Sequence, residues 1–195
     1  MTLISALESI HKKGLFGDYE DKNENKLTKI QERKNLLIIQ IVQYKKSSAS
    51  ITDINLDDLN LTNEAHKVTS NDDTRILWCG PKNWLFISTK KDLLTNIKQT
   101  LKEMDFAVTD LSHSRAIMEL EGENSKEILK KGCPFNFNKL KKNNCVNSIF
   151  HGITITVDMI DDNPNKIRLF ALRSFGESLY HSITDASLEF GYKAI

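Results

Sequence analysis

Residues 110–115 contain an aspartate, a histidine and two serines, which are the residue types of a serine nucleophile activated by a histidine base. Such a nucleophile requires the imidazole to lie within hydrogen-bond reach of the hydroxyl. If a strand runs through this segment, Asp110 and Ser112 point to one face and His113 points to the other, because strand side chains alternate. We therefore expect no catalytic triad here, and we expect the serine hydroxyls to bond backbone groups or turns.

The three cysteines, Cys79, Cys133 and Cys145, are widely spaced and include no C-x-x-C pair. This spacing favours neither a disulfide framework nor a zinc site. Cys133 follows an expected helix end, where the negative end of the helix dipole raises the pKa of a thiol. The eight glycines are scattered and form no phosphate-binding loop. We therefore predict no catalytic residue, no metal site and no cofactor in this chain.

Arginine is rare in this chain, since only five of its 27 cationic residues are arginine. Positions that use arginine can need its planar, bidentate fork, although ordinary solvated arginines are the alternative. Arg173 directly precedes Ser174 at an expected helix start, where the dipole disfavours a cation, so we expect an acidic partner such as Glu177 or a group on another chain. Trp84 is either an interface anchor or a core residue. Our candidates for contact with another protein are Trp84, His113, Arg115, Arg173 and Glu177.

Length and charge exclude several classes of protein. The chain has 195 residues, of which 39% are apolar, enough for a substantial core. Lys and Arg number 27 against 26 Asp and Glu, a net charge of +1, so no field of one sign favours nucleic acid or an anionic membrane. No apolar run approaches the roughly 18 residues that span a bilayer, and the N-terminus has no basic leader. We expect a cytoplasmic protein with no nucleic-acid or membrane partner.

Hydrophobic periodicity predicts an alternation of strands and helices after residue 74. Expected strands lie at 36–44, 75–79, 84–88, 106–111, 115–121, 145–150, 152–159 and 167–172, and expected helices at 89–104, 124–132 and 174–191. Strands with helices on one face predict an α+β, two-layer domain with an antiparallel or mixed sheet.

The N-terminal region and the stretch before residue 74 carry weaker patterns. Leu3, Ala6, Leu7 and Ile10 recur at helical spacing, whereas residues 18–34 are too polar to compensate for ordering by burial. We therefore expect residues 1–34 to form an N-terminal helix followed by a polar linker or docking arm, and residues 35–195 to form a single α+β domain. Residues 45–74 have no strong period and are expected to have little order of their own.

Four segments together resemble one family: residues 80–85 (GPKNWL), 109–115 (TDLSHSR), 131–134 (KGCP) and 173–179 (RSFGESL). The chain is similar to the gamma subunit of heterotetrameric sarcosine oxidase. The resemblance implies a fold kin to the folate-dependent aminomethyltransferases, represented by the T-protein of glycine cleavage. It also implies a non-catalytic subunit that serves assembly and cavity closure.

The same resemblance implies the chemistry of the complex. Sarcosine oxidase oxidatively demethylates sarcosine to glycine, forms hydrogen peroxide, and transfers the one-carbon unit to tetrahydrofolate. FAD, FMN, NAD, zinc and tetrahydrofolate are implied for the other subunits, and the partners are the alpha, beta and delta subunits. Two alternatives are a free-standing folate-binding or one-carbon-transfer protein, and the equivalent subunit of an N-methylglutamate dehydrogenase-type complex.

Overall fold

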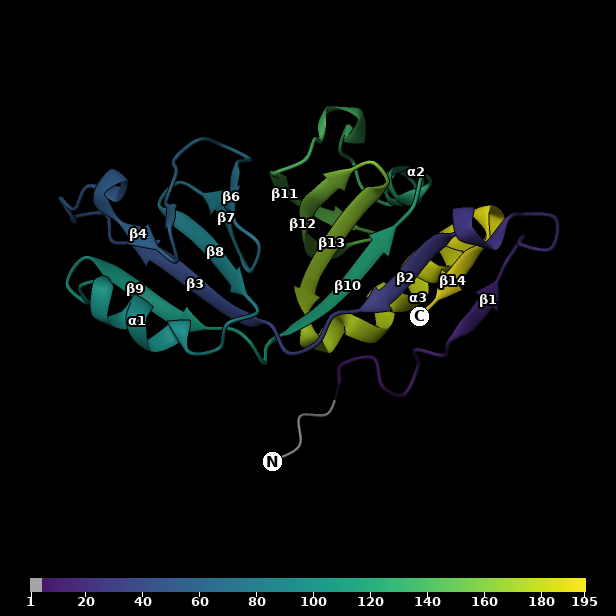
Figure 1. Cartoon of the computed structure of the whole chain (residues 1–195), viewed down its shortest axis with the longest axis horizontal. Coiled ribbons are helices and arrows are strands. Elements are labelled where there is room, and N and C mark those ends of the chain that lie inside the picture. The colour runs from purple at the N-terminus through teal and green to yellow at the C-terminus, as the bar shows by residue number, and fades with distance from the viewer. Residues whose placement is uncertain (1–4) are drawn as a thin grey trace. The chain divides into compact units, whose positions relative to one another are not determined.

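The computed structural model describes residues 5–195, which form two compact units (Figure 1). Unit 1 contains the chain up to Lys34 together with Ser114–Lys142 and Val146–Ile195, and unit 2 contains Asn35–His113 and Asn143–Cys145. A boundary does fall after Lys34, but residues 35–195 do not form the single domain that we expected. The residues after 114 join the N-terminal segment, because their strands pair with a strand that this segment contributes.

Unit 1 is built on a mixed seven-stranded sheet in the order β1-β14-β2-β10-β13-β12-β11. Its strands are β1 Gly14–Phe16, β2 Thr28–Glu32, β10 Arg115–Glu121, β11 Asn144–Phe150, β12 Ile153–Asp162, β13 Asn165–Leu172 and β14 Tyr192–Ala194. β14 pairs with β2 in parallel, whereas β10 pairs with both β2 and β13 in antiparallel fashion.

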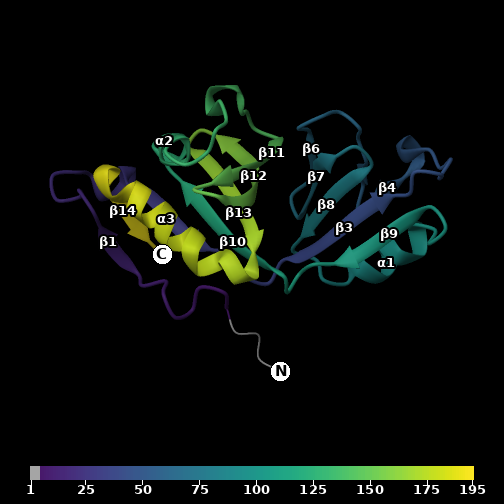
Figure 2. The same cartoon turned by 180° about the vertical axis from the view of Figure 1, so that it is seen from behind.

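Two helices cover one face of this sheet, α2 (Ser125–Lys130) and α3 (Gly176–Ser187). The view from behind in Figure 2 places α3 across the strands. Leu179 and Ile183 of α3 are fully buried and share one hydrophobic core with Met118 and Leu120 of β10. Residues of β10 alternate between faces, so Glu119 points to the face opposite the helices. Short 3₁₀ helices lie at Glu24–Lys26, Phe137–Lys139, Arg173–Phe175 and Leu188–Phe190.

Unit 2 contains a five-stranded antiparallel sheet in the order β6-β7-β8-β3-β9. The strands are β3 Leu37–Gln43, β6 Val68–Ser70, β7 Thr74–Gly80, β8 Asn83–Ser88 and β9 Phe106–Asp110. Helix α1 (Leu93–Thr100) packs on the sheet through Leu93 and Ile97, which join a core around Trp84 and Phe86. A small hairpin of β4 (Asn55–Leu56) and β5 (Leu59–Asn60) and a 3₁₀ helix at Ile51–Asp53 complete the unit.

The N-terminal region differs from its expected helix and linker. Residues 5–13 form a turn, in which His11 N donates to Leu7 O at 2.8 Å, and Leu3 lies outside the described residues. Leu7 is fully buried, so this short segment is held by packing rather than by a helix. Residues 28–32, expected to be linker, form β2 in the middle of the sheet with Ile30 fully buried.

The region at 45–74 also contains more structure than its composition predicts, because it holds β4, β5 and β6. The α+β class with a mixed sheet is confirmed. Within the described part of the chain, no helix is long and apolar enough to cross a membrane.

Candidate functional site

The antiparallel pairing of β10 with β13 brings two of the five arginines together. Arg115 opens β10 opposite Leu172, the last residue of β13. The next residue, Arg173, donates its backbone N–H to the carbonyl of Ser114 at 2.9 Å. Arg115 and Arg173 therefore lie at the same end of neighbouring strands in unit 1, although they are far apart in the sequence.

Two large apolar residues that are close to Arg173 in the sequence are exposed. Leu172 and Phe175 are each 47% exposed, whereas most large apolar residues of unit 1 are buried. We call Arg115, Leu172, Arg173 and Phe175 the arginine patch. Exposed apolar groups close to arginines are typical of protein-binding surfaces, where aromatic residues and arginine are enriched.

The arginine patch stands on a closely packed support. A Cβ added at Gly176, the first residue of α3, would lie 2.9 Å from Cβ of Ala116 and 3.5 Å from Cβ of Ala6. The N-terminal turn that carries Ala6 is itself fixed, because the buried Leu7 donates its N–H to Oε1 of Glu32 at 3.3 Å. The strand end, the N-terminal turn and the start of α3 therefore hold the arginine patch in one arrangement.

Glu177 lies one residue into α3 and is mostly exposed. Its Oε1 lies 3.7 Å from Nε2 of His181, one turn further along the helix. The spacing of Ser174 and Glu177 is that of a capping box, but α3 begins at Gly176 and its N-cap, Phe175, makes no side-chain cap bond. Glu177 therefore borders the arginine patch without capping the helix.

The other two candidate contact residues, His113 and Trp84, belong to unit 2. His113 is exposed and is the last residue of the Asn35–His113 segment. Trp84 is completely buried, and its indole Nε1 donates to the carbonyl of Thr62 at 2.7 Å. This corrects its candidacy as an interface anchor, because the β8 alternation places Trp84 in the core of unit 2.

Residues 112–114 form a turn between β9 (Phe106–Asp110) and β10. The Ser112 hydroxyl donates to Oδ1 of Asp110 at 2.6 Å and accepts the backbone N–H of Ile38 at 3.0 Å. Burial raises the pKa of Asp110, but the hydrogen bonds from Ser112 outweigh burial, so the pKa lies below its ordinary value. The Asp110 carboxylate thus fixes the turn after β9. The Ser112 hydroxyl bonds a backbone group and a residue of this turn, as predicted.

A charged cluster that sequence reasoning missed lies on the sheet face opposite the helices. Oε2 of Glu119, 1% exposed, accepts from Nη2 of Arg168 at 2.9 Å, and its Oε1 lies 3.2 Å from Nζ of Lys166. Gln31 donates to the same carboxylate at 3.0 Å, and Glu121 pairs with Lys166 at 2.9 Å. The only sequence signal was the alternation of charged and apolar residues along β10. Opposite charges are matched within the cluster, which indicates a structural role.

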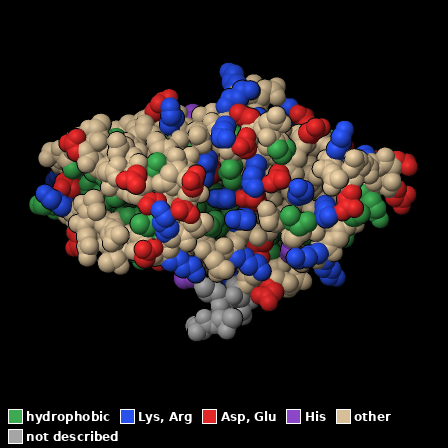
Figure 3. Space-filling model, in the orientation of Figure 1, with side chains coloured by type: hydrophobic (Ala, Val, Ile, Leu, Met, Phe, Trp, Pro, Cys, Tyr) green, Lys and Arg blue, Asp and Glu red, His purple; other side chains and the backbone are tan. Residues whose placement is uncertain are grey.

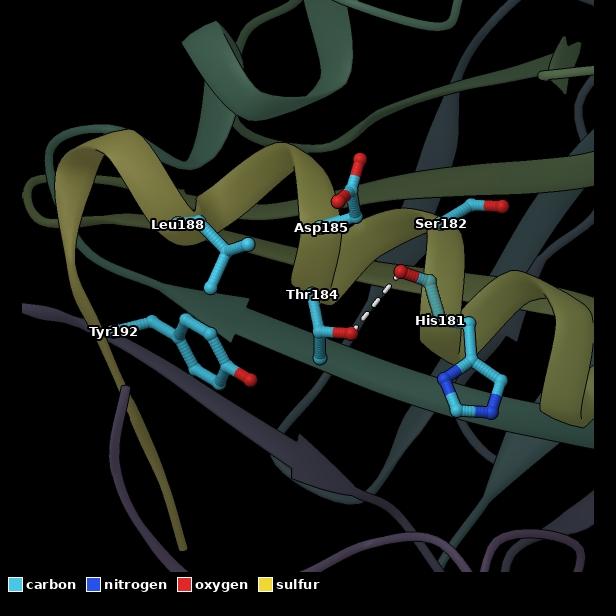
Figure 4. Close-up of a pocket in the computed structure, with 6 residues that line it drawn as sticks. All are labelled: His181, Ser182, Thr184, Asp185, Leu188 and Tyr192. Carbon is cyan, nitrogen blue, oxygen red and sulfur yellow. Dashed lines mark hydrogen bonds between the residues drawn. The ribbon is translucent and has the colours of Figure 1, made fainter. Parts of the chain in front are cut away.

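A shallow hollow of about 510 Å³ lies beside α3 in unit 1 (Figure 4). Thr184 and Tyr192 face it, and the hydroxyl of Thr184 donates to the carbonyls of Tyr180 and His181 at 2.9 and 3.1 Å. The lining residues are His181, Ser182, Thr184, Asp185, Leu188 and Tyr192. Across residues 5–195, no three His, Cys, Asp or Glu side chains gather where they could hold a metal ion.

Comparison with solved structures defines the class of fold. The chain is similar to the glycine cleavage system aminomethyltransferase T from Bartonella henselae, with a TM-score of 0.69 and 10% identity over 100% of this chain and 60% of that chain. It is also similar to a chain of the heterotetrameric sarcosine oxidase from Corynebacterium sp. U-96 in complex with pyrrole 2-carboxylate. That match has a TM-score of 0.80 and 20% identity, and it covers 96% of this chain and 95% of the other. The aminomethyltransferase-like fold is confirmed.

The sequence comparisons define the family within that class. The model of the sarcosine oxidase gamma subunit family matches residues 50–189. The sarcosine oxidase subunit gamma of Corynebacterium sp. (strain U-96) is 27% identical over 120 residues, which are 60% of this chain and 58% of that protein. Because this family model covers more than half of the chain, the chain belongs to the sarcosine oxidase gamma subunit family. The sequence match to the curated relative spans little more than half of that protein's length.

Proposed function

We propose that the chain is a non-catalytic subunit of a heterotetrameric sarcosine oxidase, in which it serves assembly and helps to close a cavity. Its membership of the gamma subunit family carries this proposal. The arginine patch supports it, since a chain that assembles with others needs an accessible surface with apolar and arginine side chains. The buried Glu119 is paired with Lys166 and Arg168 of the same unit, which fits a structural rather than a catalytic role.

In this proposal the reactive groups belong to the companion subunits. The alpha, beta and delta subunits hold FAD, FMN, NAD, zinc and tetrahydrofolate, and the whole complex converts sarcosine to glycine and hydrogen peroxide. Basic and acidic side chains are interspersed over the face in Figure 3, which gives no support to nucleic acid as a partner. A cytoplasmic location fits the three cysteines, which are free thiols.

Co-expression with candidate alpha, beta and delta subunits from the same source tests the proposal. We expect the tagged chain to co-elute with the other three in equal amounts, and the purified complex to show flavin absorbance and to oxidise sarcosine. The chain expressed alone should show no flavin spectrum. A chain that stays a monodisperse monomer while the other three subunits assemble and turn over sarcosine would contradict the proposal.

A folate-binding or one-carbon-transfer protein is the second candidate, and the aminomethyltransferase-like fold favours it. Titration of the chain alone with tetrahydrofolate separates the two candidates through the fluorescence of Trp78 and Trp84. The subunit proposal expects no saturable change, whereas a folate-binding protein gives one. An N-methylglutamate dehydrogenase-type complex would be recognised by oxidation of N-methylglutamate in place of sarcosine.

A further inference from the structure

We propose that Arg33 binds a carboxylate of a companion subunit, on the face of the unit 1 sheet opposite the helices. This inference rests on the proposed function. It adds one contact residue on this chain and the chemistry of the group that this residue meets.

Arg33 directly follows β2 and lies on the same sheet face as the charged cluster around Glu119. Its backbone N–H donates to the carbonyl of Ile117 at 2.9 Å, which continues the pairing of β2 with β10 by one residue. In that pairing Gln31 stands opposite Glu119, so strand alternation turns Arg33 and Glu119 to one face. The distance of 3.8 Å from Nε of Arg33 to Oε2 of Glu119 agrees with this placement.

The carboxylate of Glu119 is already occupied by closer donors than Arg33. Its Oε2 accepts from both Nε and Nη2 of Arg168, at 3.2 and 2.9 Å. Its Oε1 accepts from Gln31 at 3.0 Å and lies 3.2 Å from Nζ of Lys166. A separation of 3.8 Å is too long for a hydrogen bond, and among residues 5–195 Arg33 forms no other ion pair.

The guanidinium of Arg33 therefore has donors that its own chain does not use. Its Nε is buried and has no hydrogen-bond partner within the described residues. Buried polar groups are nearly always paired, so an orphan of this kind calls for a partner from outside the chain. The side chain as a whole is 39% exposed, so an incoming group can reach it. A guanidinium binds a carboxylate through two parallel N–H donors, which is a geometry that lysine cannot supply.

The charge balance of this network favours a single anion. Ion pairs connect four cations with two acids, which are Lys29, Arg33, Lys166 and Arg168 with Glu119 and Glu121. The buried Asp158, which stands opposite Arg168 in the pairing of β12 with β13, adds a third acid. One positive charge is left over. Because Arg33 has the longest ion pair of the network, the excess lies at Arg33, and one carboxylate would neutralise it.

Carbodiimide crosslinking of the assembled complex tests the inference. This reagent joins an amine to a carboxylate in contact with it but does not join a guanidinium. Arg33→Lys therefore places a reactive amine at the proposed contact and keeps the charge. The variant is co-expressed with the alpha, beta and delta subunits, and the purified complex is crosslinked and digested. We expect mass spectrometry to find a link from position 33 to a carboxylate of one companion subunit. The wild-type complex controls for links from the neighbouring Lys34.

A competition experiment measures how much the contact contributes. Two differently tagged copies of the chain, one wild type and one variant, are co-expressed with the other subunits, and mass spectrometry gives their ratio in the complex relative to the soluble lysate. We expect Arg33→Gln to lower that ratio by about tenfold, and Arg33→Lys to lower it less, because lysine keeps the charge but lacks the fork. Lys139→Gln is the matched control in unit 1. Lys139 is exposed and forms no ion pair within the described residues, so this variant should incorporate like wild type.

Two results overturn the inference while the proposed function stands. One is an assembled complex of Arg33→Lys in which position 33 links only to acids of its own chain, or to none. The other is equal incorporation of Arg33→Gln and wild type. If the alpha, beta and delta subunits assemble without either copy of the chain, the proposed function fails instead.

Discussion

Arg168 donates to one oxygen of Glu119 through both Nε and Nη2, at 3.2 and 2.9 Å, across the β10 and β13 pairing. Glu119 is 1% exposed, and the side chain of Arg168 is 11% exposed. A buried carboxylate of this kind requires compensation, because removal of one partner leaves a desolvated charge. The pair therefore links two central strands of unit 1 and makes their association sensitive to charge.

Arg168→Met should destabilise the chain by about 3 kcal/mol, because it removes the main cationic partner of a buried carboxylate. Urea unfolding followed by circular dichroism measures the change. The double variant Glu119→Gln with Arg168→Met should recover part of the loss, since the buried charge is then gone. Lys142→Met, which breaks the exposed pair with Asp161, is the control and should cost less than about 1 kcal/mol. Equal losses in Arg168→Met and Lys142→Met would disprove the assignment.

Acid should unfold the chain partly through the same carboxylate. Burial alone would raise the pKa of Glu119, but Arg168 and Lys166 outweigh burial and hold the pKa below its ordinary value of 4.5. A lowered pKa contributes stability that is present above about 4.5 and is lost as the pH falls through the folded-state value. Glu119→Gln should therefore flatten the dependence of the free energy of unfolding on pH below about 5. An unchanged slope in this variant would contradict the prediction.

Local patterns predicted most of the elements but not their long-range pairing. The expected helix at 89–104 contains α1, and the expected strands at 75–79 and 84–88 correspond to β7 and β8. β2 escaped prediction because Ile30 is its one strongly apolar residue, and its strand state depends on β10 and β14. A segment that is paired with a strand on each side can form a strand even when its own composition is polar.

For the candidate contact residues too, the sequence shows the residue type but not the position in space. Arg115 and Arg173 were selected by residue type, and the β10–β13 register brought them together. Trp84 was misplaced because a tryptophan after a turn has the same local pattern in a core as on a surface. The Glu119 cluster could not be predicted, because its members come from three strands whose order only the folded sheet defines.

Gly176→Ala should destabilise the chain by about 1–3 kcal/mol, since the new methyl would lie 2.9 Å from Cβ of Ala116. The backbone is not the cause, because Gly176 has helical dihedral angles of −56° and −49°. The double variant with Ala116→Gly removes the opposing methyl and should recover much of the stability. Thermal unfolding checks both variants. If the second substitution only adds to the loss, steric contact with Ala116 is not the reason.

Cys133 should be nearly inert in the folded chain. Burial raises the pKa of its thiol to about 11, although a hydrogen bond with Ser148 acts in the opposite direction. The thiolate is the reactive form, so alkylation by iodoacetamide near pH 8 should be much slower at Cys133 than at the partly buried Cys79. Peptide mass spectrometry gives the two rates. In urea all cysteines should react alike, and equal rates without urea would refute the prediction.

The parallel pairing of β14 with β2 has a consequence for the order in which the protein matures on the ribosome. β2 is synthesised early, but its neighbours β10 and β14 appear only after the Asn35–His113 segment and near residue 194. Nearly all of unit 2 can therefore fold as one emerging stretch before the partners of β2, the strands β10 and β14, are synthesised. A nascent chain in this state presents an unpaired strand, so its yield should depend on chaperones more than its modest size suggests.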